Sequence, residues 1–217
     1  MPKTLVITGA SRGIGKATAA EFLDNGWQVI GTSTSGHGWK RESLSWVQLD
    51  LANPDSIKAA AKLITSRGKL DVLINNAGIT DSADRDRISV PVLRRTLEVN
   101  LIGPIDFTEQ MIPAINPGGH IVSLGSGLGS IGGVTTSYAP AYSISKAALS
   151  MYTRKLAARL DDRKITVSIV SPGWVKTDMG GSSAPRRPEE AAREIFRLAT
   201  ANTPSGLFWH QGKRMAW

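Results

Sequence analysis

The sequence predicts a single doubly wound α/β domain that spans all 217 residues and contains about seven parallel strands. Three observations support this fold. Short runs of aliphatic and β-branched residues recur along the chain, as expected for strands buried on both faces of a parallel sheet. Segments of helical periodicity separate these runs, which is the alternation of an α/β protein. A glycine-rich turn joins the first run to the first helical segment.

Composition excludes several other kinds of protein. Apolar residues make up 41% of the chain and charged residues 20%, and no apolar run approaches the roughly 20 residues of a membrane-spanning helix. Because the chain has no cysteine, it cannot form a disulfide, a thiolate nucleophile or a cysteine-ligated zinc site. The first residues also lack a signal-peptide pattern. We therefore expect a cytoplasmic protein with no membrane partner.

The chain carries a net charge of +8, from 26 basic and 18 acidic residues. Such a surplus would suit nucleic acid, an anionic cofactor or an acidic carrier protein. The basic residues occur as short pairs such as Lys40-Arg41 and Arg94-Arg95, without the long basic tract or interleaved aromatic residues of single-strand binders. We therefore expect no nucleic-acid partner. The three histidines lack the spacing of metal ligands, so we also expect no metal site.

The first predicted strand covers residues 4–8 and leads into a turn with glycines spaced G-x-x-x-G-x-G. A helix follows to about residue 26. Glycines let the backbone approach a pyrophosphate, and a helix N-terminus offers free N–H groups and a positive dipole. A Walker A loop is excluded, because Ala10 and Ala17 stand where it needs glycine and a hydroxyl residue. The turn is therefore predicted to bind phosphate groups of another kind of ligand.

The remaining elements follow from the same patterns. Asn53 provides an N-cap for a helix that ends near Ser66. A longer helix is expected over residues 90–115, where Pro104 removes one backbone hydrogen bond and crowds the carbonyl group of Asn100. We predict a kink and a free carbonyl group at that point. Further helices are expected over residues 142–159 and from 188, and strands over residues 4–8, 28–32, 46–51, 70–74, 119–126, 165–170 and 206–209.

Tyr142 and Lys146 stand four positions apart on a predicted helix, so their side chains share one face. A phenol titrates near ~10 in water and is a poor acid or base at neutral pH. A nearby cation lowers that pKa and brings the phenol towards general acid–base catalysis. The same spacing also occurs by chance on solvated helix faces. It gains meaning here because a phosphate-binding turn lies upstream.

Six motifs follow one another along the chain: Thr8-Gly9-x-x-x-Gly13-x-Gly15, Asn75-Asn76-Ala77-Gly78, Asn100-x-x-Gly103, Ser126, Tyr142-x-x-x-Lys146 and Pro172-Gly173-x-Val175-x-Thr177. In this order they resemble the short-chain dehydrogenase/reductase family, whose members have a Rossmann-type fold. The resemblance covers essentially the whole chain. The short segment 180–187 and the tail that ends in tryptophan are similar to those of the C-factor-like and sniffer-like carbonyl reductases of that family.

The resemblance implies a catalytic set of Asn100, Ser126, Tyr142 and Lys146. Tyr142 would protonate a substrate carbonyl oxygen while a nicotinamide cofactor delivers hydride to the carbon. Lys146 would lower the Tyr142 pKa and hold the nicotinamide ribose. Ser126 would polarise the carbonyl group, and the main-chain oxygen of Asn100 would anchor a proton-relay water. The offset of 16 residues between Ser126 and Tyr142 is slightly longer than usual in the family.

The second strand indicates which dinucleotide is bound. A NAD-specific enzyme usually carries Asp or Glu at the end of that strand to hold the ribose hydroxyls, whereas residues 31–34 contain no acid. Arg12 is placed to pair with a 2′-phosphate, with Lys40 and Arg41 as further candidates, although many NADP-preferring relatives carry arginine where Thr34 stands. We therefore favour NADP(H) over NAD(H). Together with the resemblance, the sequence implies cofactor contacts at Gly9, Ser11, Arg12, Gly13, Ile14, Gly15, Asp50, Leu51, Asn76, Ala77, Gly78, Tyr142, Lys146, Pro172, Gly173, Val175 and Thr177.

The expected function is NADPH-dependent reduction of an aldehyde or ketone, or the reverse oxidation of an alcohol. Two alternatives stay open. One is a 3-oxoacyl-carrier-protein reductase, whose acidic partner would match the basic surface; the other is an NADP(H)-binding sensor with little turnover. Segment 180–187 would form a short substrate lid, with Trp174 as a candidate wall of the pocket. Relatives are often homodimers or homotetramers built on the tyrosine-bearing helix and its neighbour, and both assemblies are open here.

Overall fold

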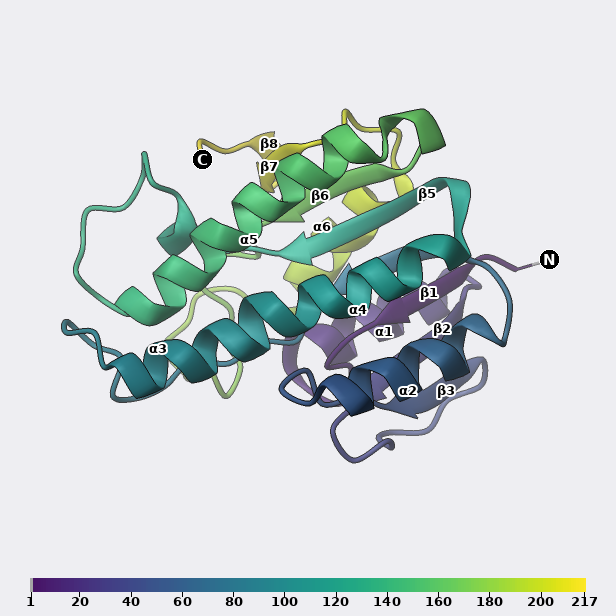
Figure 1. Ribbon diagram of the computed structural model, residues 1–217, viewed down its shortest axis with the longest axis horizontal. Coiled ribbons are helices and arrows are strands. Elements are labelled where there is room, and N and C mark those ends of the chain that lie inside the picture. The colour runs from purple at the N-terminus through teal and green to yellow at the C-terminus, as the bar shows by residue number, and fades with distance from the viewer. Residues whose placement is uncertain (1) are drawn as a thin grey trace.

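An eight-stranded sheet organises the computed structural model, which describes residues 2–217 (Figure 1). The strands lie in the order β3-β2-β1-β4-β5-β6-β7-β8, and every neighbouring pair is parallel except the last. The predicted fold class is confirmed. The antiparallel strand β8 was not predicted, because a strand of two residues leaves no recognisable pattern in the sequence. The strands are β1 Thr4–Ile7, β2 Gln28–Ser33, β3 Leu44–Gln48, β4 Leu70–Asn75, β5 Ile115–Leu124, β6 Thr166–Val170, β7 Leu207–His210 and β8 Lys213–Arg214.

Helices cover both faces of the sheet (Figure 1). Side chains alternate along β1: Val6 joins the core beneath α2, α4 and α5, whereas Leu5 and Ile7 join the core beneath α1 and α6. Each central strand therefore buries both of its faces, as its apolar run predicts. Within residues 2–217, no helix is both long enough and apolar enough to cross a bilayer. The helices are α1 Gly13–Asp24, α2 Pro54–Thr65, α3 Val90–Leu97, α4 Gly103–Met111, α5 Pro140–Arg159 and α6 Pro188–Thr200.

The strand order reverses beside β1. From β1 the chain passes through α1 to β2 on one side, and β4 pairs with β1 on the other side before the chain continues to β5. The loops that follow β1 and β4 thus diverge towards opposite faces of the sheet. Ligands of open α/β sheets bind in the crevice at such a point, outside the carboxyl ends of the strands. The glycine turn and residues 75–78 both lie there.

Pro104 interrupts the long helix that the sequence predicts over residues 90–115. The structure divides this region into α3, a π-helical turn at Glu98–Ile102 and α4. The predicted distortion at Asn100 is confirmed, because proline offers no N–H to the preceding turn. The free carbonyl group of Asn100 stays a prediction.

Of two predicted helix ends, one agrees with the structure and one does not. Asn53 caps α2 as predicted, since its side-chain oxygen accepts two backbone N–H groups of the first turn at 3.0 and 3.1 Å. The helix predicted to reach residue 115 instead ends at Met111, before a 3-10 turn that leads into β5. Pro113 explains the early end, because it lacks the N–H that a continuing α-helix needs.

Candidate active site

The glycine turn after β1 and the segment after β4 form one hydrogen-bonded frame. The side chain of Asn76 donates to the carbonyl groups of Thr8 (2.8 Å) and Gly9 (3.1 Å). In return, the Thr8 hydroxyl accepts the N–H groups of Asn76 and Ala77, each at 3.0 Å. A Cβ atom on Gly15 would lie 2.2 Å from the Gly9 carbonyl oxygen, so only glycine fits. The frame holds the start of α1 beside the carboxyl end of β4.

A cavity of about 520 Å³ opens along the carboxyl ends of these strands. Its volume lies within the range of ligand sites, about 300–1,000 Å³. Two predicted cofactor residues do not line it: Val175 is buried, and Gly173 faces Arg186 and His210. Across residues 2–217, no three metal-ligating side chains gather as a metal site would require. The predicted cofactor residues that line the cavity are Gly9, Ser11, Arg12, Gly13, Ile14, Gly15, Asp50, Leu51, Asn76, Ala77, Gly78, Tyr142, Lys146, Pro172 and Thr177.

Three of the predicted catalytic side chains meet beside this cavity. Tyr142 and Lys146 project from α5, and the Lys146 Nζ atom lies 5.5 Å from the centroid of the Tyr142 ring. The ammonium group donates to the carbonyl group of Leu124, at the end of β5, at 2.8 Å. Ser126 follows the same strand, and its side chain lies close enough to Tyr142 to act on the pKa of the phenol. The end of β5 and one face of α5 therefore supply a single polar cluster.

Burial shifts the two titrating groups of this cluster in opposite directions. Burial raises the pKa of Tyr142 to about 12, although the nearby Ser126 side chain acts the other way. It lowers the pKa of Lys146 to about 8. Both shifts have one cause, because a poorly solvated site disfavours the charged form of each group. The predicted lowering of the Tyr142 pKa is therefore not seen; the phenol stays protonated and can act as a proton donor.

The side chain of Asn100 ties the segment after β4 to the catalytic helix. Its oxygen accepts the N–H of Ile79 at 2.7 Å, and its amide group donates to the Ile79 carbonyl at 2.9 Å and to the Ser145 hydroxyl at 3.2 Å. A Cβ atom on Gly78 would meet both Asn100 Oδ1 (3.3 Å) and Lys146 Nζ (3.6 Å). The π-helical turn thus brings Asn100 close to the lysine. Its proposed role through the main-chain oxygen stays a prediction.

Asp84 is a site residue that the sequence did not reveal. It lies in the polar segment 81–87, which reads as a solvated loop, yet only 3% of its surface is exposed. Its carboxylate accepts the N–H groups of Ala141 (3.0 Å) and Tyr142 (2.9 Å), and so caps the first turn of α5. One signal was available: α5 begins at Pro140 with no Ser, Thr, Asp or Asn before it to act as its own cap.

Residues at the end of the sequence hold the loop that follows Ser126. The Ser130 hydroxyl donates to the carbonyl group of Ala216 at 2.9 Å, and the Gly132 N–H donates to that of Trp217 at 2.9 Å. The sequence predicted neither contact. The Gly/Ser-rich loop after Ser126 is therefore anchored by the tail as well as by hydrogen bonds among its own residues.

Arg12, the candidate partner of a 2′-phosphate, lies at the cavity but is already paired. Its guanidinium lies 3.1 Å from Asp178, two residues before the predicted lid segment 180–187, and both side chains are more than three-quarters exposed. Arg41, a further candidate, pairs with Asp24 at the end of α1 instead. Lys40 does not line the cavity. Of the three cations that the sequence suggested, the structure places only Arg12 on the cavity wall.

Trp174 closes the lid turn instead of lining the cavity. Its indole N–H donates to the carbonyl group of Gly180 at 2.7 Å, while 57% of the residue remains exposed. Trp174 therefore does not line the cofactor cavity, and its role as a wall of the substrate pocket stays a prediction. Met179 of the same segment lines the cavity, as do Thr32, Ser33, Thr34, Ile79 and Arg95.

Comparisons with known proteins agree with this geometry. A sequence profile of the short chain dehydrogenase family matches residues 3–188. A 3-oxoacyl-[acyl-carrier-protein] reductase of Vibrio cholerae is 33% identical, covering 94% of this chain and 83% of its own. A crystal structure of a putative short-chain dehydrogenase/reductase from Burkholderia multivorans with bound NADP superposes with a TM-score of 0.92 at 29% identity over all of both chains. An NADPH-bound carbonyl reductase from chicken fatty liver gives 0.91 at 28% identity, over 100% of this chain and 94% of the other. The chain belongs to the short-chain dehydrogenase family of oxidoreductases.

Proposed function

We propose that this protein reduces a small aldehyde or ketone to an alcohol with NADPH. The observation that carries the proposal is the cluster of Ser126, Tyr142 and Lys146 beside a cavity whose other wall is the glycine frame. A binding protein has no need of a protonated phenol held next to a buried ammonium group. The likeness to carbonyl reductases across nearly the whole chain supports the same choice.

Each catalytic side chain has a part in this reaction. When bound, the reduced nicotinamide supplies a hydride to the carbonyl carbon. Tyr142 donates its hydroxyl proton to the carbonyl oxygen, which its raised pKa permits over the physiological pH range. Ser126 donates a hydrogen bond to the same oxygen and so favours the charge that develops there. Lys146 holds the cofactor ribose, and the main-chain oxygen of Asn100 holds the water through which Tyr142 is reprotonated.

The residues present fit a dinucleotide, and NADP(H) better than NAD(H). The close approach at Gly15 leaves the backbone N–H groups of the turn and the start of α1 accessible to a pyrophosphate. Ser33 and Thr34, at the end of β2, line the cavity where a NAD-specific enzyme would carry a carboxylate. Arg12 supplies a cation there. We infer that Asp178 competes with a 2′-phosphate for Arg12, so Asp178→Asn should increase the ratio of kcat/KM for NADPH to that for NADH.

The first test is oxidation of NADPH, with NADH in parallel, against aldehydes, diketones, quinones and a 3-oxoacyl-carrier thioester. Tyr142→Phe should lower turnover by about 10²–10⁴-fold, the usual contribution of a general acid. Tyr138→Phe is the matched control, because Tyr138 is 57% exposed and has no lysine four residues later. Equal turnover in the two variants would contradict the mechanism. Cofactor binding without turnover of any substrate would favour the sensor alternative.

A 3-oxoacyl-carrier-protein reductase is the second candidate. The identity with the Vibrio cholerae enzyme favours it, and Arg95 on the cavity wall, with Arg94 beside it on α3, offers positive charge to an acidic carrier. The two candidates differ in salt dependence. A carrier-bound substrate should be preferred over the same thioester on a short pantetheine arm at low salt, and lose that advantage as the salt concentration rises. Equal rates on both thioesters would exclude a carrier partner.

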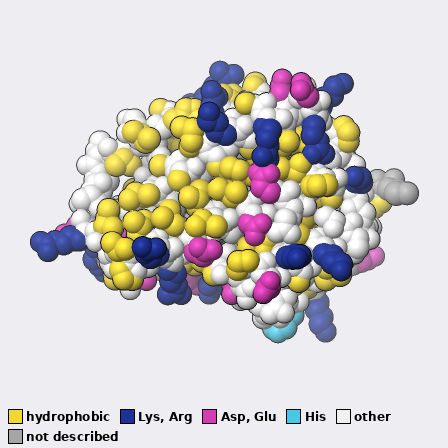
Figure 2. Space-filling view, viewed as in Figure 1, with side chains coloured by type: hydrophobic (Ala, Val, Ile, Leu, Met, Phe, Trp, Pro, Cys, Tyr) yellow, Lys and Arg dark blue, Asp and Glu magenta, His cyan; other side chains and the backbone are white. Residues whose placement is uncertain are grey.

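We also propose a homodimer built on α5 and the π-helical turn. Figure 2 shows hydrophobic side chains gathered on the face that α4 and α5 form. On α5 and the π-helical turn, Ile144, Met151 and Ile102 are 41%, 61% and 49% exposed. Apolar side chains that gather on a surface in this way mark interaction sites, whereas scattered ones are normal. Light scattering should give twice the mass of one chain, and Met151→Glu should shift it towards the monomer.

A further inference from the structure

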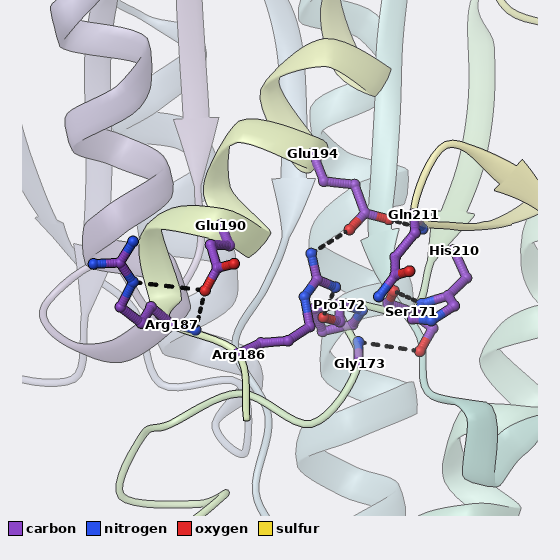
Figure 3. A network of polar contacts seen from close by, with 9 residues as sticks. All are labelled: Ser171, Pro172, Gly173, Arg186, Arg187, Glu190, Glu194, His210 and Gln211. Atoms are coloured by element: carbon purple, nitrogen blue, oxygen red, sulfur yellow. Dashed lines mark hydrogen bonds and ion pairs between the residues drawn. The ribbon is translucent and has the colours of Figure 1, made fainter. Parts of the chain in front are cut away.

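A buried ion pair, which the proposed mechanism does not use, lies against the segment that follows β6, on the side of α6 (Figure 3). Arg186 Nη2 lies 2.9 Å from Glu194 Oε2, and the two side chains are only 17% and 11% exposed. Arg187 and Glu190, one position further and one turn earlier, form a contrasting pair at 3.6 Å with 72% and 40% exposure. Loss of one partner from the buried pair would leave an uncompensated charge away from water, whereas loss of a partner from the exposed pair should have little effect.

The guanidinium of Arg186 also binds the nicotinamide-side segment directly. Its Nη1 atom donates to the carbonyl group of Pro172. The other side of Pro172 lines the cofactor cavity. The two nitrogens of one planar group therefore connect the cavity wall to Glu194 on α6, which an ammonium group could not do with the same geometry.

Backbone contacts of the same residue close the base of the loop 174–186, which carries the predicted lid segment 180–187. The N–H of Lys176 donates to the Arg186 carbonyl at 2.8 Å, and the N–H of Arg186 donates to the Trp174 carbonyl at 3.3 Å. The intervening segment includes Thr177, which lines the cavity. Arg186 therefore lies where the two ends of this loop meet, and its side chain links them to Pro172.

Gly173 shows how closely this arrangement is packed. Its φ of +78° favours glycine, and a Cβ atom would lie 3.2 Å from Arg186 Nη1 and 3.3 Å from His210 Cε1. His210 in turn places Nδ1 2.9 Å from the carbonyl oxygen of Ser171. Two successive carbonyl groups, of Ser171 and Pro172, are thus bound by side chains on the side away from the cavity. Their peptide planes cannot turn without breaking these bonds.

Glu194 extends the connection to the last strands. Its second carboxylate oxygen accepts the backbone N–H of Gln211, in the turn between β7 and β8. Loss of Arg186 would leave this buried carboxylate without its counter-charge, and the group would be drawn towards solvent. Pro172 would then lose both its hydrogen bond and the neighbour that keeps it in place.

We infer that Arg186 is a positioning residue for the nicotinamide half of the cofactor, acting through the Pro172 carbonyl and the base of the loop 174–186. This inference rests on the proposed function, because it assumes that the segment from Pro172 to Thr177 contacts that half. The adenosine half rests on the glycine frame and the end of β2, which Arg186 does not contact. A loss of Arg186 should therefore affect the two halves unequally.

Arg186→Gln and Arg186→Lys test the inference, with Arg187→Gln as the matched control. The lysine variant keeps a charge for Glu194 and so keeps the fold should the glutamine variant fail to fold. Because a misplacement of about 1 Å can cost about 100-fold in rate, we expect kcat/KM for NADPH to fall by about 10- to 100-fold in both variants. Affinity for adenosine 2′,5′-bisphosphate, which lacks the nicotinamide half, should stay at the wild-type value. Arg187→Gln should change neither quantity.

Two results would overturn the inference. One is wild-type kcat/KM for NADPH in both Arg186 variants. The other is an equal loss of affinity for NADPH and for the bisphosphate, which would indicate a role in folding alone. A wild-type protein that binds the bisphosphate but neither binds nor oxidises NADPH would overturn the proposed function, and this inference with it. If the wild type turns over normally, the proposed function stands and only the inference about Arg186 has failed.

Discussion

Burial is the largest influence on the pKa of His120. The side chain is 4% exposed in β5, and its Nε2 atom lies 2.9 Å from the Ser168 hydroxyl. Burial lowers its pKa from 6.5 to about 4, although a hydrogen bond with the backbone of Ala199 acts the other way. In the unfolded chain the ordinary value returns. As the pH falls below 6.5, the unfolded state therefore binds this proton before the folded state does.

The contribution of His120 to the free energy of unfolding should accordingly be fully present above pH 6.5 and be lost progressively between pH 6.5 and 4. At about 1.4 kcal/mol for each unit of pKa difference, His120 accounts for a loss of about 3 kcal/mol. Urea unfolding of the wild type and of His120→Gln at pH 7 and 4.5 measures it. The variant should lose less stability on acidification. The exposed His37, changed to Gln, is the control and should behave as the wild type; equal pH dependence in all three proteins would contradict the prediction.

Helix α5 depends on a distant residue for its first turn. Asp84 accepts the N–H of Tyr142 itself, so it fixes the backbone that carries the proposed proton donor. Asp84→Ala should lower the free energy of unfolding by about 1–2 kcal/mol, the usual effect of losing an N-cap, and should lower kcat as well. Asp84→Asn retains one acceptor oxygen, so its stability and its kcat should lie between those of the wild type and those of Asp84→Ala. Asp86→Ala, in the same segment but exposed, is the control. A loss of stability with kcat unchanged would show that the cap does not position Tyr142.

Elements whose signals are local could be predicted from the sequence, and those that depend on distant contacts could not. The strands, the glycine turn and the distortion near Asn100 follow from apolar runs, glycine spacing and Pro104, each within a few residues. Asp84 is separated in sequence from the two residues that it caps, Ala141 and Tyr142, by 57 and 58 positions. The hydrogen bond from Ser130 to Ala216 spans 86 positions. No pattern along the chain marks these partners. Ser126, Tyr142 and Lys146 could be predicted as one catalytic set only from the resemblance to a family, because their spacing in the sequence does not by itself indicate that they act together.

At the scale of the whole molecule, the end of the sequence returns to the catalytic side of the sheet. Trp217 packs against Phe208 of β7, with ring centroids 5.7 Å apart, and Arg154 of α5 lies 5.6 Å from its ring. Its carbonyl group accepts the N–H of Gly132, and the carbonyl group of Ala216 accepts the Ser130 hydroxyl. The loop after Ser126 therefore depends on β7, β8 and α5 together for its position.

Deletion of residues 215–217 should loosen that loop without touching the glycine frame. We expect a higher KM for the carbonyl substrate and a wider range of accepted substrates, because the loop loses two hydrogen bonds and the packing of Met215 and Trp217. The dissociation constant for NADPH should remain that of the wild type, since none of the three deleted residues lines the cofactor cavity. Trp217→Phe, which keeps an aromatic ring and the backbone carbonyl group, should preserve most of the substrate preference. A deletion that weakened NADPH binding as much as substrate binding would instead assign the tail to the stability of the whole sheet, because β8 pairs only with β7 at its edge.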